Sequence, residues 1–588
     1  MDVTIRVHAT SALPPAVTSV VPYAAVLAHP EQFYNAGDIV WVTMASALVF
    51  LMIPALSLIY AGLSNRSFAM SMFRLPLMTA AVVGLQWAFW GYSLTFTDGT
   101  LGSGWYGGEP RANALADVVA RPITVGNGDG PPIPELLYVL YEGMFAAFTA
   151  AIVCGGTIHR VKPARFLVFI TLWSILIYDV IARWTWHGRG WSNRLGVLDF
   201  AGGTPVHITS GTTVAAFALF YDFEVSDKAF FAYIWHFSRR VLERIQHNFL
   251  VIWNLVIGGV FVALKRAKVV RGSPNFIVPP FEPEETPDEK ESDPYSNIYV
   301  ALGTGILWFG WAGFNGGSAL GGNLRAVSAW LSTHIAACSG GVVGILWQWY
   351  DKLWEMGDRD FATRDDGDRH VDQTVLWFCD GAIAGLIAIT PGSGYVPVWS
   401  APIFGAAAAI FVPIFKKESE ALLKHDKLHV FAVHTGAGLV GMCLTGLLAD
   451  PVTVHLDGHS TLPFVDEYSK GRRLGFQVAD ALAAIGYTFT MTVLILYFMK
   501  LIVWLTGKAF SLKLKWRSAA GFHDVDGGNF VPTVVVDDLQ PTTTQRWRDD
   551  LERRENIIVG LMSRSSTFNG VAAVPPGPAV QAIVQQAP

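Results

Sequence analysis

Long apolar stretches recur along this chain, and they limit its fold more than any other feature. A helix that crosses the hydrocarbon core of a bilayer needs roughly 20 mostly apolar residues, and the chain contains eleven runs of about this length between charged or Gly/Pro-rich segments. With 52% hydrophobic and only 15% charged residues, the composition agrees. The sequence therefore predicts an all-α polytopic membrane protein with eleven transmembrane helices. The predicted spans are 38–62, 72–97, 133–157, 165–186, 199–221, 297–319, 326–350, 374–392, 398–415, 428–449 and 476–506.

Basic residues between the spans predict the orientation, because Lys and Arg are enriched in cytoplasmic loops. The loops after the first, third, seventh and ninth spans are basic, whereas the loop after the eighth span, 391–397, carries no charge. We therefore expect the N-terminus outside the cell and the C-terminus in the cytoplasm. Residues 1–37 lack the basic start and compact apolar core of a signal peptide, so the first span is expected to direct the chain to the membrane.

The spans divide the chain into five parts. An extracellular segment, 1–37, precedes a first half, 38–221, and a cytoplasmic insert, 222–296, separates it from a second half, 297–506. A cytoplasmic tail, 507–588, follows; it is polar and ends in a Pro/Gly/Ala/Gln-rich segment, so we expect it to be partly disordered.

The insert contains one further apolar run, Asn248–Leu264. As a single crossing it would reverse every later loop and place the basic loops outside, against the charge pattern. The run is therefore an interfacial helix, part of a hairpin, or absent from the native protein. Our hypothesis is that Glu224–Gly259 is a retained intron, because Glu-Val-Ser is what a common splice-donor sequence encodes; finding the stretch in the transcript would contradict it.

Several classes of function find no support in the sequence. The net charge of −5 and the lack of a basic block argue against a nucleic-acid partner. We find no nucleophile motif, phosphate loop or HExxH, so we expect neither an enzyme nor a cofactor. The four cysteines lie in apolar runs without CxxC spacing, which favours buried thiols over disulfides. His425, His429 and His434 have no acid or thiol at ligand spacing, so no metal site is predicted.

Two histidines stand at matching depth in the predicted membrane. His207 lies about eight residues into a span that begins outside, and His434 about six into a span that begins inside, at 1.5 Å per residue. Both approach mid-depth from opposite faces, as an inverted repeat of spans one to five and six to ten would produce, with the eleventh span additional. Taken alone, His207 is better explained as a core histidine whose ring is satisfied by a neighbouring hydroxyl. Asp199 can likewise be explained without a role in binding, since a carboxylate at the start of a helix caps free N–H groups.

Five motifs together resemble a known family. "DFAGGTPVHITSG", "LYEGMFA", "WFGWAGFNGGSALGGNLRA", "DGAIAGLIAITPGSGYV" and "HVFAVHTGAGLVG" are similar to the fifth, third, sixth, eighth and tenth helices of the ammonium transporter (Amt/Mep/Rh) family. The resemblance runs from about Gly37 to Gly507 without the insert and is strongest to eukaryotic microbial ammonium permeases. It implies a homotrimer in the plasma membrane, with one narrow pore through each subunit, that carries ammonium or its methyl analogue.

The resemblance also implies roles for individual residues. His207 and His434 match the twin pore histidines, and Asp199 matches the acid that shapes the outer recruitment site from within. The remaining matched positions are Trp186 and Ser318 for recruitment of the ion, Phe145, Phe314 and Tyr141 for an aromatic gate, and Trp311 for the pore lining.

The physical chemistry of these side chains fits those roles. A cation over an indole face gains about 0.5–2 kcal/mol, but burying an intact ion in a dry pore costs far more. Ammonium can shed its proton, pass as ammonia and hydrogen-bond along two imidazoles, whereas potassium has no proton to lose. Two rival functions remain: an ammonium sensor that signals through the tail, and a neutral gas channel of the Rh type, which would need no recruitment site at Trp186.

Three positions depart from the family pattern. His429 stands where an acid is common, which predicts an added titratable group in the inner part of the tenth helix. Val180 and Arg183 replace a proline and a histidine, which predicts a less kinked fourth helix with a more basic outer end. The segment "WTWHGRGW" is one residue longer than in some relatives, so the match of Trp186 is less secure than that of His207.

Overall fold

The computed structural model describes residues 2–7, 17–99, 104–123, 133–156, 162–223, 296–356, 367–420, 423, 426–458, 460, 465 and 467–509. The chain divides into two compact units, Met1–Ala519 and Ala520–Pro588, and every described residue belongs to the first. The hypothesis about Glu224–Gly259 and almost all of the predicted tail lie outside the described residues.

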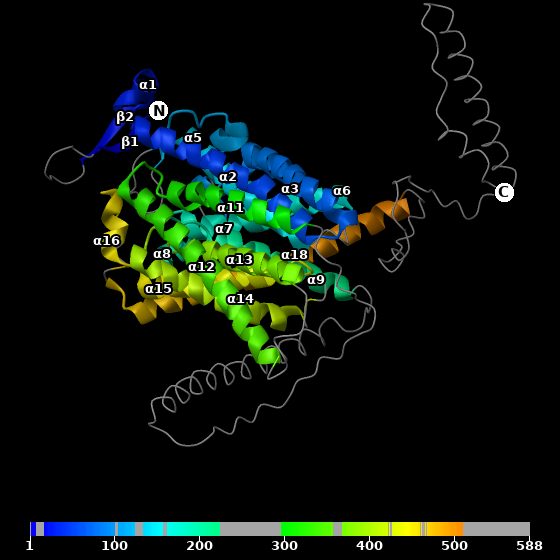
Figure 1. Ribbon diagram of the computed structural model, residues 1–588. Coiled ribbons are helices and arrows are strands. Elements are labelled where there is room, and N and C mark those ends of the chain that lie inside the picture. Colours follow the sequence, from blue (N-terminus) through cyan, green and yellow to red (C-terminus); the bar gives the residue numbers. More distant parts are fainter. Residues whose placement is uncertain are drawn as a thin grey trace, which may run out of the picture. The chain divides into compact units, whose positions relative to one another are not determined.

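Five helical segments form the first half, and three of them contain a wide turn (Figure 1). Such π-turns hold one extra residue per turn and so redirect the side chains that follow. In chain order the segments are α2 (Ala36–Leu63); α3 (Arg66–Gln86) with the π-turn η2 (Trp87–Gly91) and α4 (Tyr92–Phe96); α5 (Glu135–Val153) with the 3₁₀ turn η4 (Cys154–Gly156); α6 (Pro163–Trp173) with the π-turn η5 (Ser174–Tyr178) and α7 (Asp179–Trp186); and the π-turn η6 (Gly203–Ile208) with α9 (Thr209–Phe223).

Six further segments follow residue 296. They are α11 (Asn297–Gly317), α12 (Leu324–Met356), α13 (Gly367–Ile389), α14 (Ala401–Glu420), the π-turn η8 (Phe431–Gly436) with α15 (Ala437–Leu448), and α18 (Lys470–Ala509). Short connecting helices are α1 (Tyr23–Ala28), α8 (Trp191–Leu195) and α16 (Pro451–Val454), with 3₁₀ turns η1 (Pro30–Gln32), η3 (Pro110–Leu115), η7 (Val398–Ser400) and η9 (His455–Asp457).

Each predicted span coincides with one of these helical segments. Within the described ranges, eight segments are long and apolar enough to cross a membrane, and 373–389 forms a shorter apolar helix. The segments at 203–223 and 297–317 are less apolar because they carry Ser, Thr, Asn and Gly at buried positions. Their polar side chains face the protein interior rather than lipid. The protein is therefore an all-helical polytopic membrane protein.

The N-terminal segment contains strands that the sequence reading did not predict. β1 (Asp2–Val7) pairs antiparallel with β2 (Val17–Pro22), with Asp2 opposite Pro22. Both strands are rich in Val, Ile and Thr, which favour extended backbone.

A second pair of strands lies between α4 and α5. It joins the two-residue strands β3 (Pro122–Ile123) and β4 (Ile133–Pro134).

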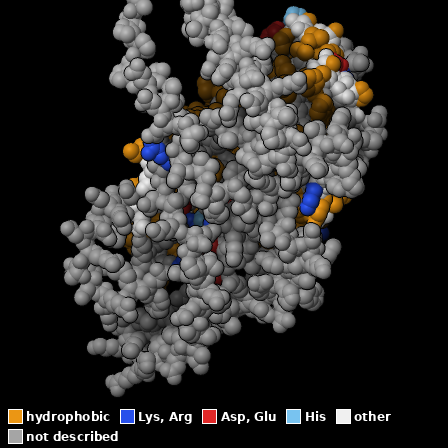
Figure 2. Space-filling model, turned by 90° about the vertical axis from the view of Figure 1, so that its right-hand side faces the viewer, with side chains coloured by type: hydrophobic (Ala, Val, Ile, Leu, Met, Phe, Trp, Pro, Cys, Tyr) orange, Lys and Arg blue, Asp and Glu red, His pale blue; other side chains and the backbone are white. Residues whose placement is uncertain are grey.

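Large apolar side chains lie exposed on the outside of the helical unit. They include Phe50, Leu85, Phe309 and Leu346, all more than half exposed. On the face shown in Figure 2, the visible described side chains are mostly hydrophobic, with isolated basic ones among them. Exposed apolar surface of this extent would be unfavourable in water and suits contact with lipid.

Glycines allow three helices of the second half to touch through their backbones. A Cβ atom added at Gly340 on α12 would overlap the carbonyl oxygen of Gly381 on α13, and one at Gly405 on α14 would overlap that of Ala336 on α12. The sequence motif "CSGGVVG" is therefore a packing surface, as small residues in membrane helices commonly are.

The substitution Gly340→Val is expected to destabilise the protein, because overpacking a close contact costs about 1–3 kcal/mol. The matched control is Gly305→Val on α11, where an added Cβ meets no atom within 4 Å. The measurement is the melting temperature of the detergent-solubilised protein, followed by size-exclusion chromatography. Equal melting temperatures for the two variants would contradict the glycine contact.

Candidate functional site: a conduit with paired histidines

The two predicted histidines meet in the interior. The Nδ1 atoms of His207 and His434 lie 3.1 Å apart, and the ring planes are inclined by 22° with centroids 5.4 Å apart. Since two Nδ1 atoms face each other, one of them carries the proton and donates while the other accepts. Nε2 of His207 is buried and has no hydrogen-bond partner in the described part of the chain. That atom is free to bind a small polar molecule.

Both histidines lie in π-turns that begin beyond a buried aspartate. The carboxylate of Asp199 accepts hydrogen bonds from the backbone N–H groups of Gly202, Gly203 and Thr204, at 2.8, 2.7 and 2.7 Å. Gly202 has φ +112°, a left-handed conformation that glycine adopts without strain. Eight residues after Asp199 the chain reaches His207, which the cap and the π-turn direct into the interior.

The second histidine segment repeats this local design. The carboxylate of Asp426, eight residues before His434, accepts from the backbone N–H groups of Val430 and Phe431 at 2.9 and 2.8 Å. Burial raises the pKa of Asp426 to about 6, and the two N–H groups limit that rise. The sequence reading missed Asp426, although its spacing to His434 equals that of Asp199 to His207 and could have revealed it.

Two phenyl rings close the space next to His207. Phe145 of α5 and Phe314 of α11 stack with centroids 4.1 Å apart and planes inclined by 22°, and both are almost completely buried. Trp186 of α7 meets the ring of Phe145 edge-on at 6.1 Å, and its Nε1 donates to the carbonyl oxygen of Asp199 at 3.0 Å. Successive ring contacts thus link Trp186 through the phenyl pair to His207.

The hydroxyl groups beside the phenyl pair bind the backbone of α11. Tyr141 lies within hydrogen-bond distance of the carbonyl oxygens of Gly313 and Phe314, at 3.0 and 2.8 Å, and of Ser318 Oγ, at 3.2 Å. Ser318 in turn donates to the carbonyl oxygen of Phe314 at 2.9 Å. These bonds hold the end of α11 against α5, which keeps Phe314 stacked on Phe145.

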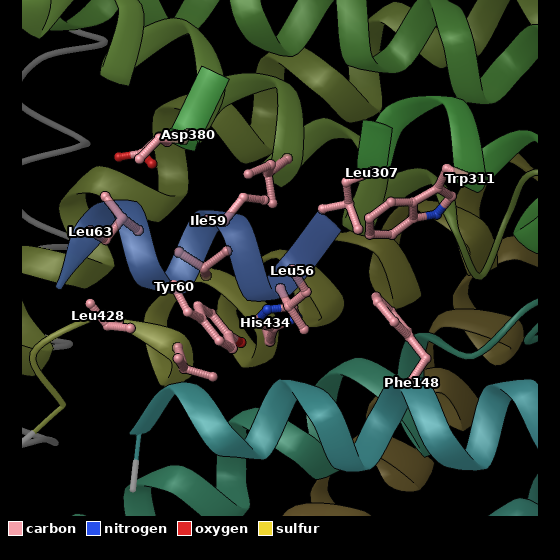
Figure 3. A pocket seen from close by; sticks show the side chains of 14 residues that line it. Leu56, Ile59, Tyr60, Leu63, Phe148, Leu307, Trp311, Asp380, Leu428 and His434 are labelled. Carbon is pink, nitrogen blue, oxygen red and sulfur yellow. The ribbon is translucent and has the colours of Figure 1, made fainter. Parts of the chain in front are cut away.

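His434 also lines a cavity of about 50 Å³ (Figure 3). Such a volume accommodates several water-sized molecules, since one needs about 10–15 Å³. Trp311 stacks on His207 at 5.6 Å with planes inclined by 16°, and its Nε1 donates to Thr390 Oγ1 at 3.0 Å. Trp311 and Phe148 line one end of the cavity, Asp380 lies at the other end together with Leu63 and Leu428, and His434 lies between the two ends. We refer to the two ends of the conduit as the Trp186 end and the Asp380 end.

The structure thus gathers nearly all the sequence-predicted site residues along one path. From the Trp186 end the order is Trp186, the phenyl pair, His207 and His434, with Tyr141 and Ser318 beside the phenyl pair and Trp311 beside His207. Asp199 differs, because backbone N–H groups occupy its carboxylate and only its carbonyl oxygen contacts Trp186. The helix-cap reading of Asp199 describes this geometry.

Two of the predicted departures take a different form in the structure. The fourth segment contains a π-turn, η5, just before Val180, so it is irregular without a proline at that position. Arg183 is fully buried and donates to the carbonyl oxygens of Thr95 and Thr97, both at 2.8 Å, so it does not make the helix end a basic surface. The carbonyl partners of Arg183 come from the end of the neighbouring helical segment, which a single-helix reading omits.

His429 also lies outside the helix in which it was expected. It precedes η8 with φ +53°, and its Nε2 contacts Glu420 Oε1 at 3.2 Å rather than lining the cavity. Within the described residues no three His, Cys, Asp or Glu side chains form a group that could hold a metal ion. His425 is outside those residues.

The protein is all-helical and membrane-spanning, and aromatic rings and paired imidazoles follow one another in its interior. These features are typical of proteins that conduct small molecules across a bilayer. Comparison with known proteins identifies the family within this class. The model of the Ammonium Transporter Family matches residues 40–223, 276–359 and 366–509, and the chain belongs to this family. The match omits 224–275, which includes the whole of Glu224–Gly259.

Individual relatives agree with this assignment. Ammonium transporter 1 of Schizosaccharomyces pombe is 35% identical over 480 residues, which cover 80% of this chain and 78% of the relative. Ammonium transporter MEP2 of Saccharomyces cerevisiae is 31% identical over 480 residues, covering 80% and 79%. Among solved structures, Candida albicans Mep2 matches with a TM-score of 0.60 and 32% identity, covering 81% of this chain and 86% of that one.

Proposed function

We propose that this protein transports ammonium across a membrane and that ammonia, rather than the intact ion, passes its narrowest part. The observation that carries the proposal is the hydrogen-bonded pair of His207 and His434 behind a closed phenyl pair. A charged ion between those apolar rings would lose its hydration without compensation. The relatives that resemble this chain are named ammonium transporters, which agrees with that chemistry.

The proposed topology has eleven transmembrane helices, with the N-terminus outside and the C-terminus inside. The Trp186 end then faces the outside and the Asp380 end the cytoplasm. An inverted repeat of five helices is supported by the contacts between equivalent elements, because α2 packs along α11 and η6 lies against η8. The equal spacing of Asp199 to His207 and of Asp426 to His434 supports the same repeat.

At the outer end we assign ion recruitment to Trp186 and Ser318. An indole face attracts a cation by about 0.5–2 kcal/mol, and a serine hydroxyl can replace one water of hydration. Asp199 stabilises this end by holding the start of η6 and, through its carbonyl oxygen, the indole N–H of Trp186. Tyr141 holds Phe314 in the gate.

In the middle of the conduit the imidazoles provide the polar contacts for ammonia. Each neutral ring offers one donor and one acceptor nitrogen, and ammonia can use both kinds. Potassium cannot give up a proton, so the apolar gate would exclude it. Selectivity then follows from the ability to deprotonate, and the proton leaves ammonium before the phenyl pair opens.

We further propose that the protein forms a homotrimer in the plasma membrane, with one conduit in each subunit. This assembly follows from the resemblance to the family, and the exposed apolar surface of the helices suits contact with lipid and with other subunits. The mass of the detergent-solubilised protein, measured by light scattering, tests it.

The test of the function is uptake of ammonium and of methylammonium by cells that lack their own transporters. Wild-type protein at the cell surface should support saturable uptake of both, and Trp186→Ala should lower the apparent affinity. Uptake that does not depend on Trp186 would favour a neutral gas channel. Surface protein that moves neither substrate would exclude transport and favour a sensing role.

A further inference from the structure

One acidic residue at the inner part of the conduit takes no part in the proposed path of ammonia. Asp380 lies within the apolar helix 373–389 of α13, between Cys379 and Gly381. A carboxylate in such a segment costs about 2.5–3.5 kcal/mol on insertion scales and usually marks a pathway. It stands well inside α13 and therefore cannot cap the start of that helix.

Asp380 is one of the residues that line the cavity. Figure 3 places it at the end of the cavity opposite Trp311, with His434 between them. Although neighbouring protein atoms surround it closely, its side chain keeps an exposed surface at this end of the cavity. No hydrogen bond or ion pair joins Asp380 to any other residue in the described ranges; Lys416 acts on it electrostatically from a greater distance. A purely structural acid would have a close partner.

The other walls of the cavity are unsuited to holding an ion by themselves. Apart from Asp380 and His434 they consist of aliphatic and aromatic side chains, of which Tyr60 already donates its hydroxyl to the carbonyl oxygen of Ile152 at 2.9 Å. Asp380 is thus the single anionic group of this lining. Low-polarity walls strengthen the attraction of a carboxylate for a cation, because they screen it less than water does.

We propose that Asp380 forms an ammonium-binding site at the inner end of the conduit. Ammonia that leaves His434 enters this cavity, where it takes up a proton from water, leaving hydroxide, and becomes ammonium. The N–H groups of ammonium donate charge-assisted hydrogen bonds to the Asp380 carboxylate. Ammonium from the cytoplasm reaches the same site, so internal ammonium occupies the exit and slows further influx. This site rests on the proposed transport function.

The experiment uses the full-length protein in liposomes that are loaded with increasing concentrations of ammonium chloride. The initial influx of labelled methylammonium is measured, and choline chloride replaces ammonium chloride inside the control liposomes. In the wild type, internal ammonium should inhibit influx. In Asp380→Asn, the half-inhibitory concentration should rise about tenfold, as expected when a charge-assisted hydrogen bond is lost, while the apparent KM for external substrate stays unchanged.

Two variants serve as matched controls. Asp380→Glu keeps the charge and should keep the inhibition, and Glu418→Gln removes an acid of α14 that does not line the cavity and should behave as the wild type. If Asp380→Asn does not fold, Leu428→Phe narrows the same end of the cavity and should raise the half-inhibitory concentration as well.

The outcomes separate this inference from the function on which it rests. Wild-type protein that moves no substrate into empty liposomes would refute transport itself. A different result would overturn only the inner site. In that case influx is normal, but internal ammonium inhibits Asp380→Asn or Leu428→Phe as strongly as it inhibits the wild type. Loss of all influx in a folded Asp380→Asn protein would also overturn it, because the carboxylate would then belong to conduction itself.

Discussion

Ammonium uptake is expected to fall by roughly 10- to 100-fold when His207 or His434 is replaced by alanine, as a loss of about 1–3 kcal/mol of hydrogen bonding in a dry conduit implies. Each substitution removes a ring that contacts the other at 3.1 Å and leaves a buried nitrogen without its partner. The measurement is the initial rate of methylammonium uptake per molecule at the cell surface. Because the rings act as one pair, the double variant should be little slower than either single variant.

The matched control for this prediction is His334→Ala. His334 lies in α12, is exposed, and contacts Trp308 rather than the conduit. Its removal should leave uptake unchanged. If His334→Ala were as slow as His207→Ala, or if both conduit variants transported at the wild-type rate, the paired imidazoles would not form the path of the substrate.

The largest loss of stability is expected for Asp199→Ala. The carboxylate accepts three backbone hydrogen bonds in the interior, and leaving such donors unpaired costs about 1–3 kcal/mol each. These contributions are not strictly additive, so we expect a loss of about 3 kcal/mol or more. The yield of folded protein and its melting temperature should both fall, and uptake should fall with them.

Two comparisons test whether backbone capping causes this loss. Asp426→Ala removes the equivalent cap before His434 and should be destabilising too, with two hydrogen bonds lost instead of three. Asp38→Ala removes one exposed hydrogen bond to the backbone of Gly322 and should have little effect. A stable, inactive Asp199→Ala protein would contradict the capping role and would assign Asp199 to the substrate instead.

Hydropathy was sufficient to predict the positions of the helices, because each apolar run of about 20 residues has one favourable state in a bilayer. Depth arithmetic was also sufficient to predict that His207 and His434 would approach each other, since both segments rise at a known rate. It could not predict that the contact joins two Nδ1 atoms, because that depends on the π-turns η6 and η8. Nothing in a pattern of apolar residues distinguishes a π-turn from an α-turn.

Other features depend on contacts between segments that are distant in the sequence. The burial of Arg183 requires the carbonyl groups of Thr95 and Thr97, and the cavity beside Asp380 requires side chains of α2, α11 and α13 together. Asp426 was overlooked for a different reason. It stands just before the predicted tenth span, in a loop that was considered only for its positive charges.

The contact between His207 and His434 has a consequence for the movement of protons. Only one hydrogen atom lies between the two Nδ1 atoms. A proton that arrives on Nε2 of the donating ring can push that hydrogen to the other ring, which then releases its own Nε2 proton. The donating and accepting roles of the two rings are then exchanged. In this state the pair can pass the next proton only in the opposite direction. Such a relay has to be reset before it can pass a second proton in the same direction.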